Sequence, residues 1–251
     1  SVLDEEALLA RCHYAEGHKG EGPLSVVIWT TTPWTLPANR AVALNPELEY
    51  AVVQADLGHG AERLLLAEAL LKDVMLRYDC EHYQVVAYCR GQELEHLKLA
   101  HPFYDREVPV ILGDHVTTEA GTGAVHTAPG HGQDDYVVGQ RYGIAVDNPV
   151  GANGLFVEGT ELFAGKHVFS ANEHVLEVLK GKGALVHEEM LQEVHEAGIA
   201  VVYENLPLEH MEQQVADGAI PLVLISSYRI YGEKVPHWVV VTGFDRNFVY
   251  V

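Results

Sequence analysis

Short runs of apolar, β-branched residues alternate with turn-forming residues over the first 130 positions. These runs predict strands at residues 24–30 (LSVVIWT), 50–54, 84–90, 108–112 and 123–127. Two other stretches, residues 65–78 and 171–180, place apolar residues at helical spacing and predict helices. Ser170 or Asn172 would cap the second helix, and Gly181 or Gly183 would end it.

The pattern changes after residue 189, where helix and strand signals begin to alternate. Helices are predicted at residues 190–197 and 208–217, with strands at 199–203, 220–226, 238–242 and 248–251. The chain stops within the last of these strands. This change of pattern divides the chain into residues 1–189 and residues 190–251.

The composition of the 251-residue chain, 48% hydrophobic and 21% charged, is ordinary for a globular protein and excludes disordered and collagen-like chains. Its apolar runs are too short to cross a bilayer, and no signal segment opens it. The three cysteines (Cys12, Cys80 and Cys89) form no CxxC and indicate a reducing compartment rather than a disulfide scaffold. We therefore expect a cytoplasmic protein without membrane contact.

The formal charge of −20 narrows the possible partners. A general nucleic-acid-binding surface needs many basic side chains, because neutralisation of phosphates supplies most of the non-specific affinity. If this chain meets nucleic acid, we expect it to read one end or one nucleotide in a pocket while other protein holds the backbone.

The first polar segment is TTTPWTLPANR, residues 30–40, which two prolines prevent from forming a regular helix. It offers four hydroxyl groups, which donate and accept hydrogen bonds, and one amide (Thr30, Thr31, Thr32, Thr35 and Asn39). Such a surface suits sugar hydroxyls, an ester carbonyl or an ammonium group, with Trp34 as a flat wall. The alternative is a strand end and turn with Trp34 in the core.

The second polar segment, GTGAVHTAPGHGQDDY at residues 121–136, carries two histidines and two carboxylates. One interpretation is a metal site built from His126, His131 and an aspartate, although HxxxxH matches no standard metal template. Another is a hydrolytic pocket in which Asp135 holds a cation and His126 positions water. The third makes Asp134 a helix cap and the histidines solvated. Like-charge repulsion predicts that only one of the two aspartates faces a pocket.

Together the two segments resemble the editing domain of isoleucyl-tRNA synthetase. TTTPW and GTGAVH are similar to the isoleucine type, whereas leucine and valine relatives usually carry TTRP and a PAH-type second loop. LGDHV, NPVG and KGALVHEE extend the resemblance over about residues 1–189. The resemblance implies an α+β, β-barrel-like domain, inserted in a Rossmann core, that hydrolyses mischarged Val-tRNA(Ile).

The resemblance also implies roles for individual residues. Asp135 would anchor the substrate α-ammonium, and His126 would border the side-chain pocket and help to exclude isoleucine. The terminal adenosine, the ester and the attacking water would lie among residues of the first segment (Thr30, Thr31, Thr32, Thr35 and Asn39), with Trp34 as a wall. Thr32 and Asp135 are the predicted catalytic residues. Water is the expected attacker, with no metal and no cofactor.

The synthetase signatures HIGH and KMSKS do not occur in this sequence, so we expect no amino-acid activation and a catalytic core outside this chain. Two alternatives stay open. One is a metal-dependent hydrolase using His126, His131 and Asp135, and the other is a non-catalytic binding module.

The stretch GAIPLVLISSYRIYGEKVPHWVVVTGFDRNFVYV resembles the C-terminal half of a papain-like, double-glycine-leader peptidase family. There His237 would be the catalytic histidine. The nucleophilic cysteine has no counterpart here, and the orienting aspartate would lie beyond Val251. We therefore expect a small α/β appendage without peptidase activity, in which His237 is an ordinary strand residue.

Overall fold

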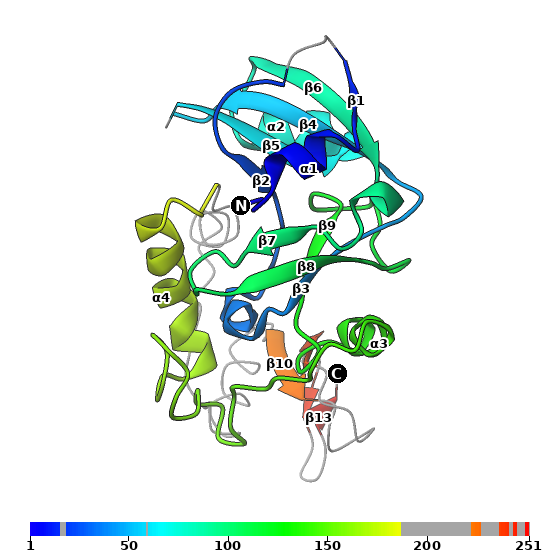
Figure 1. The fold of residues 1–251 in the computed structure, drawn as a ribbon. Coiled ribbons are helices and arrows are strands. Elements are labelled where there is room, and N and C mark those ends of the chain that lie inside the picture. Colours follow the sequence, from blue (N-terminus) through cyan, green and yellow to red (C-terminus); the bar gives the residue numbers. More distant parts are fainter. Residues whose placement is uncertain are drawn as a thin grey trace.

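The computed structural model describes residues 1–15, 19–58 and 60–186, together with four short strands nearer the C-terminus. The fold is α+β, as predicted, and is built on two open sheets that lie one above the other in Figure 1. Neither sheet closes into a barrel in the described part of the chain, so the β-barrel-like expectation is corrected to open sheets.

The first sheet has five strands in the order β1-β6-β4-β5-β2. Its members are β1 (His13–Tyr14), β6 (Tyr83–Arg90), β4 (Glu49–Asp56), β5 (Ala61–Ala67) and β2 (Leu24–Val26). The central strand β4 is buried along most of its length. Side chains of α1 (Glu5–Leu9) and α2 (Leu71–Arg77) share the hydrophobic core of this sheet, which explains why its strands are apolar on both faces.

The second sheet has the order β7-β8-β3-β9 and positions the two polar segments. Its members are β7 (Lys98–Ala100), β8 (Glu107–Leu112), β3 (Ala41–Leu44) and β9 (Ala124–Thr127). Strand β3 continues directly from the first polar segment, and β9 lies within the second. Their antiparallel pairing, with Val42 opposite His126, brings the two segments together across more than eighty residues.

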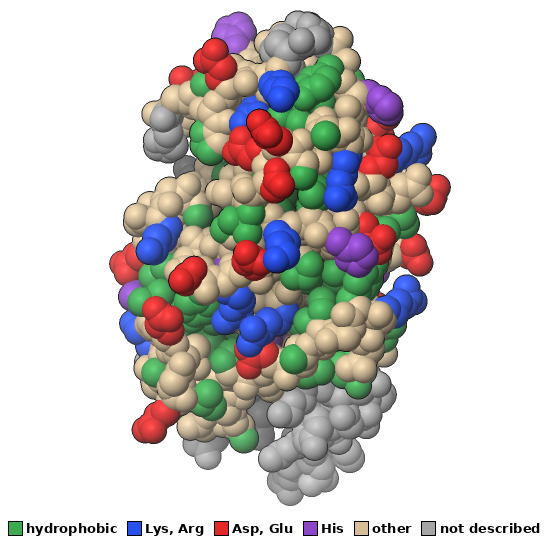
Figure 2. Space-filling model, viewed as in Figure 1, with side chains coloured by type: hydrophobic (Ala, Val, Ile, Leu, Met, Phe, Trp, Pro, Cys, Tyr) green, Lys and Arg blue, Asp and Glu red, His purple; other side chains and the backbone are tan. Residues whose placement is uncertain are grey.

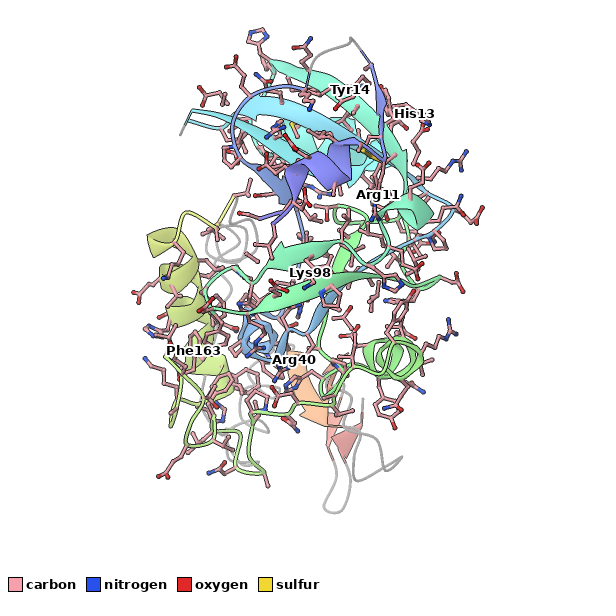
Figure 3. All side chains as sticks on the ribbon, viewed as in Figure 1. Arg11, His13, Tyr14, Arg40, Lys98 and Phe163 are labelled. Atoms are coloured by element: carbon pink, nitrogen blue, oxygen red, sulfur yellow. A yellow bond between two sulfur atoms is a disulfide. The ribbon has the colours of Figure 1, made fainter. Side chains whose placement is uncertain are left out.

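The first polar segment forms the 3-10 helix η1 (Pro33–Ala38), which agrees with the expectation that it is no regular helix. Helix α4 (Val168–Gly181) packs against it, and the Trp34 amide donates a 3.0 Å hydrogen bond to Asn172 Oδ1. The aromatic side chain of Phe163 lies beside α4 in Figure 3 and belongs to the same core cluster. Helix α4 therefore fixes the position of the first segment through this hydrogen bond and the shared core cluster.

The prediction of a helix at residues 65–78 is wrong for the first residues of that range and correct for Leu71–Arg77. Residues up to Ala67 belong to β5, and a turn of 3-10 helix, η2 (Glu68–Leu70), precedes α2. Pairing with β4 puts Leu65 opposite Val52 and buries it fully, so tertiary pairing overrides the local helical spacing. The strand predicted at 24–30 is likewise shorter, ending at Val26.

The helix predicted at residues 171–180 is confirmed as α4, but its cap differs from the prediction. Neither Ser170 nor Asn172 caps it, because the helix begins earlier and His167 is the N-cap. The His167 Nδ1 atom accepts a 3.4 Å hydrogen bond from the Phe169 amide. Two further short elements lie in the described residues, η3 (Gly91–Leu94) and α3 (Gln133–Arg141).

The structure joins Cys12 and Cys89 in a disulfide, whereas the cysteine count favoured a reducing compartment without disulfides, so that expectation is corrected for this pair. Pairing of β1 with β6 sets His13 opposite Tyr88, so the preceding Cys12 falls beside Cys89. The two cysteines are 77 positions apart in the sequence. Cys80 is free and buried.

Most of the C-terminal predictions, including the helices at 190–197 and 208–217 and the strand at 199–203, lie outside the described residues. The strands that are described are β10 (Leu222–Ser226), β11 (Pro236–Val240), β12 (Gly243–Phe244) and β13 (Val249–Tyr250). They lie within or next to the strands predicted there. Antiparallel pairing places Ile225 opposite His237. None of the helices in the described segments is long and apolar enough to span a bilayer.

Gly123, which leads into β9, should tolerate no side chain. Its φ is +75°, and a Cβ there would lie 2.3 Å from the Ala67 Cβ of the first sheet. Backbone strain and the clash together should cost Gly123→Ala about 2–4 kcal/mol in the free energy of unfolding. Gly143→Ala is the matched control, since its φ is +64° with open space around it, and should cost about 1 kcal/mol. Equal losses for both variants in urea unfolding would contradict the clash.

Candidate active site

A cavity of about 300 Å³ lies where the two polar segments meet. Its lining is drawn from residues immediately before and within those segments, namely Trp29, Thr30, Thr31, Thr32, Thr35, Val125, His126, Ala128, His131 and Asp135. A larger, more open hollow of about 620 Å³ lies beside the end of α3, between Glu95 and Arg141. None of the residues of the two segments lines that hollow, so the smaller cavity is the candidate site.

Local hydrogen bonds shape the threonine wall of the cavity. The Thr32 amide donates to Thr30 Oγ1 at 3.1 Å, which folds the chain back before η1 begins. Thr35 is buried within η1 and donates its hydroxyl proton to the Thr32 carbonyl at 2.9 Å. Thr31 is exposed, and Thr30 and Thr32 are half-buried, so these three present hydroxyl groups at the mouth of the site.

His126 forms the floor of the site from β9. Its Nε2 atom lies 3.0 Å from Thr35 Oγ1, and its side chain is buried. Burial, together with the nearby His131 and His101, lowers the pKa of His126 to about 4. The imidazole is therefore neutral at pH 7.

Asp135 enters the site from the first turn of α3. Its Oδ2 atom accepts a 2.9 Å hydrogen bond from the Ala128 amide, which fixes the carboxylate between the loop and the helix. Burial raises the pKa of Asp135, while the Ala128 hydrogen bond and His115 oppose the shift. Asp134 is exposed, which matches the expectation that only one aspartate faces the pocket. The helix cap is Gly132 rather than Asp134.

Two predicted substrate-binding residues stand behind the cavity rather than in its lining. Trp34 is 7% exposed and meets the ring of His131 edge-on at 5.2 Å. Asn39 is 2% exposed, and its Nδ2 atom donates to the Ala41 carbonyl at 2.8 Å. Both support the wall, and their direct contact with substrate stays a prediction.

The sequence did not single out Trp29, Val125 or Ala128 as lining residues. Trp29 adjoins the threonine run, but it was assigned to a strand. It is 45% exposed. A Cβ on Gly121 would lie 3.3 Å from its ring. The sequence offered His131 as a metal ligand or as a solvated loop residue, not as part of a substrate cavity. His126, His131 and Asp135 all border the cavity, yet no group of histidine, cysteine or carboxylate side chains in the described residues is arranged to hold a metal ion.

Comparison with known proteins connects this geometry to a family. A family model described as leucyl-tRNA synthetase, editing domain, matches residues 20–179, well over half of the chain. The chain belongs to this editing-domain family. A crystal structure of GlLeuRS-CP1 shares the fold of this editing domain with a TM-score of 0.53 at 15% identity, covering 66% of this chain and 84% of that one. The cytosolic leucyl-tRNA synthetase editing domain of P. falciparum matches with a TM-score of 0.51 at 9% identity, covering 66% and 80%.

The sequence relatives of this editing domain are isoleucine–tRNA ligases, which confirms the isoleucine-type resemblance. The ligase of Methylococcus capsulatus is 69% identical over 193 residues, covering 76% of this chain and 20% of the ligase. The chain thus spans about a fifth of the length of these relatives.

A second family model, described as a Peptidase_C39 like family, matches residues 171–251 and confirms the C-terminal resemblance. The two models overlap within α4. The division at residue 189 stays a prediction.

The buried histidines predict how the stability of this editing domain depends on pH. Burial also lowers the pKa of His101 to about 4. Because the unfolded chain binds protons near pH 6.5 and the folded chain does not, both histidines should destabilise the fold as pH falls from about 6.5 towards 4. Asp135, whose folded pKa is raised, acts in the opposite direction.

The free energy of unfolding should therefore fall less between pH 6.5 and 4.5 in His126→Gln than in the wild-type chain, by up to about 3 kcal/mol. Urea unfolding at several pH values measures the slope. An unchanged slope in the variant would show that His126 titrates alike in both states.

Proposed function

We propose that this chain hydrolyses the ester bond of a mischarged aminoacyl-tRNA, with valine on isoleucine tRNA as the substrate. One observation carries the proposal: a single small cavity gathers threonine hydroxyl groups, a half-buried carboxylate and a neutral imidazole from the two polar segments. These groups match an ester that carries an ammonium group and sugar hydroxyls.

Asp135 would bind the α-ammonium of the aminoacyl group. Its Oδ2 atom is held by the Ala128 amide, and its partly buried carboxylate gains more from a cationic partner than an exposed one would. The positive ammonium would in turn favour the ionised carboxylate, offsetting the rise in pKa that burial causes.

The threonine wall would bind the terminal adenosine and the ester. Thr30 and Thr32, whose hydroxyls lie 3.4 Å apart, present donors and acceptors to the sugar and to a water molecule at the carbonyl. No cysteine lines the cavity, so an attacking water fits the lining better than a thiol nucleophile. Thr32 is the residue that we assign to orienting this water.

Selectivity for valine over isoleucine would require that the part of the 300 Å³ cavity that receives the side chain has no room for one further methylene. One missing methylene is worth only about 1–3 kcal/mol in a pocket that must admit the larger side chain, so a second, smaller pocket has to reject what the first accepts. Val125 would provide an apolar boundary, and the adjacent His126 of β9 would border the same space with a neutral ring.

The rest of the synthetase would hold the tRNA body. On the face shown in Figure 2, acidic and basic side chains are interspersed rather than gathered into a basic surface, and the chain carries −20 overall. We propose that the chain itself binds only the aminoacylated 3′ end, and that residues 190–251 form a separate appendage. A cytoplasmic location belongs to the same proposal.

Asp135→Asn should reduce deacylation of Val-tRNA(Ile) about ten- to a hundredfold, because a hydrogen bond to a charged group contributes about 1.5–3 kcal/mol. Single-turnover release of radiolabelled valine measures the rate. Asp134→Asn makes the same chemical change one residue earlier on the exposed side of α3 and should leave the rate unchanged. Unaltered hydrolysis by Asp135→Asn would sink the assignment.

The full chain should release valine faster than isoleucine from isoleucine tRNA, and EDTA should not alter either rate. The metal-dependent alternative, which uses His126, His131 and Asp135, predicts that EDTA stops the reaction. The binding-module alternative predicts no hydrolysis of either ester by a chain that is folded by circular dichroism.

A further inference from the structure

A chain of hydrogen bonds runs from the Thr32 carbonyl through the Thr35 hydroxyl to the His126 ring. A threonine hydroxyl carries one proton, and a backbone carbonyl can only accept. The Thr35 hydroxyl donates this one proton to the Thr32 carbonyl, 2.9 Å away. The 3.0 Å contact between Thr35 Oγ1 and His126 Nε2 then requires the proton on Nε2, with the hydroxyl oxygen as acceptor.

This arrangement fixes the tautomer of His126. The imidazole is neutral because it is buried, so a proton on Nε2 leaves a bare lone pair on Nδ1. That Nδ1 atom is buried and has no hydrogen-bond partner in the described residues. A buried acceptor without a donor is costly, which indicates that something outside the described chain supplies the donor.

His101 provides an internal comparison. It is also a buried, neutral histidine, and its Nε2 atom lies 3.0 Å from the Leu36 carbonyl, which requires the same Nε2–H tautomer. Its Nδ1 atom, however, accepts hydrogen bonds from the Phe103 and Tyr104 amides at 3.3 and 3.1 Å. The fold thus supplies donors to Nδ1 of His101, whereas Nδ1 of His126, a residue of the cavity lining, has none among the described residues.

We propose that Thr35 is a positioning residue that holds His126 in the Nε2–H tautomer, so that Nδ1 accepts a hydrogen bond from an N–H or O–H group of the bound aminoacyl-adenosine end. The assignment of the tautomer rests on the two hydrogen bonds of Thr35 and the burial of His126. The hydrogen bond from the ligand to Nδ1 rests on the proposed function. Thr35, predicted from the sequence to touch substrate, thereby acts through His126 instead.

Imidazole ¹⁵N spectra of the full chain test the tautomer without any activity measurement. His126→Gln identifies the His126 signals, and His101 serves as the reference. Both histidines should show a protonated Nε2 and an unprotonated Nδ1 at pH 7, with Nδ1 hydrogen-bonded in His101 and unpartnered in His126. A proton on Nδ1 of His126, or a mixture of tautomers in the wild-type chain, would overturn the proposal.

The hydrogen bond from the ligand to Nδ1 is tested with adenosine that carries valine through an amide in place of the ester. At saturation the Nδ1 signal of His126 should move towards the hydrogen-bonded position, while the signals of His101 stay fixed. An unmoved Nδ1 signal at demonstrated saturation contradicts this hydrogen bond. If wild-type chain binds the amide but hydrolyses no ester, the proposed function fails while the tautomer assignment stands.

Thr35→Val removes the hydroxyl at nearly constant volume, and Thr35→Ser restores it. The valine variant should lower the single-turnover rate on Val-tRNA(Ile) at least about tenfold and produce mixed His126 tautomers, and the serine variant should recover both within about threefold. Thr160→Val is the control and should change neither, because the Thr160 hydroxyl has no hydrogen-bond partner within the described part of the chain and Thr160 does not line the cavity. A rate within twofold of wild type for folded Thr35→Val would remove Thr35 from this role.

Discussion

The pairing of β3 with β9 is the interaction on which the site depends. It sets Val42 opposite His126 and Ala41 opposite Thr127, so the chain that leaves η1 runs beside the chain that enters α3. The four backbone pairs of this ladder hold the threonine wall and the histidine floor at fixed separation. Strand β8 supports β3 from its other edge in parallel orientation. A site made on this ladder keeps its geometry better than one made on loops alone.

Around this ladder, burial sets the protonation of the chemistry-bearing groups. His126 loses its charge because it is desolvated next to two other histidines, and Asp135 keeps part of its solvent and a backbone donor. The two groups consequently differ in kind, one a neutral hydrogen-bonding group and the other a carboxylate suited to a cation. Like-charge cost is avoided because Asp134 turns to solvent on the same helical turn.

The residues behind the cavity wall support the wall by packing and hydrogen bonding. Helix α4 donates Asn172 to the backbone of Trp34, and Trp34 in turn packs edge-on against His131. On the other side Asn39 caps the start of β3 by bonding the Ala41 carbonyl. Trp34 and Asn39 stand behind the lining of the cavity, and their direct contact with substrate stays a prediction.

Periodicity and turn residues act locally, so the sequence alone located most of the strands and the two segments that carry the chemistry. The α+β class came from the family resemblance of those segments. Like-charge repulsion indicated that only one of Asp134 and Asp135 faces a pocket, and the family resemblance pointed to Asp135. Tertiary structure alone decided that residues up to Ala67 are strand, that Cys12 meets Cys89, and that Trp29 borders the cavity while Asn39 does not. Those outcomes depend on which strands pair across long sequence separations, and no local pattern of side chains encodes that choice.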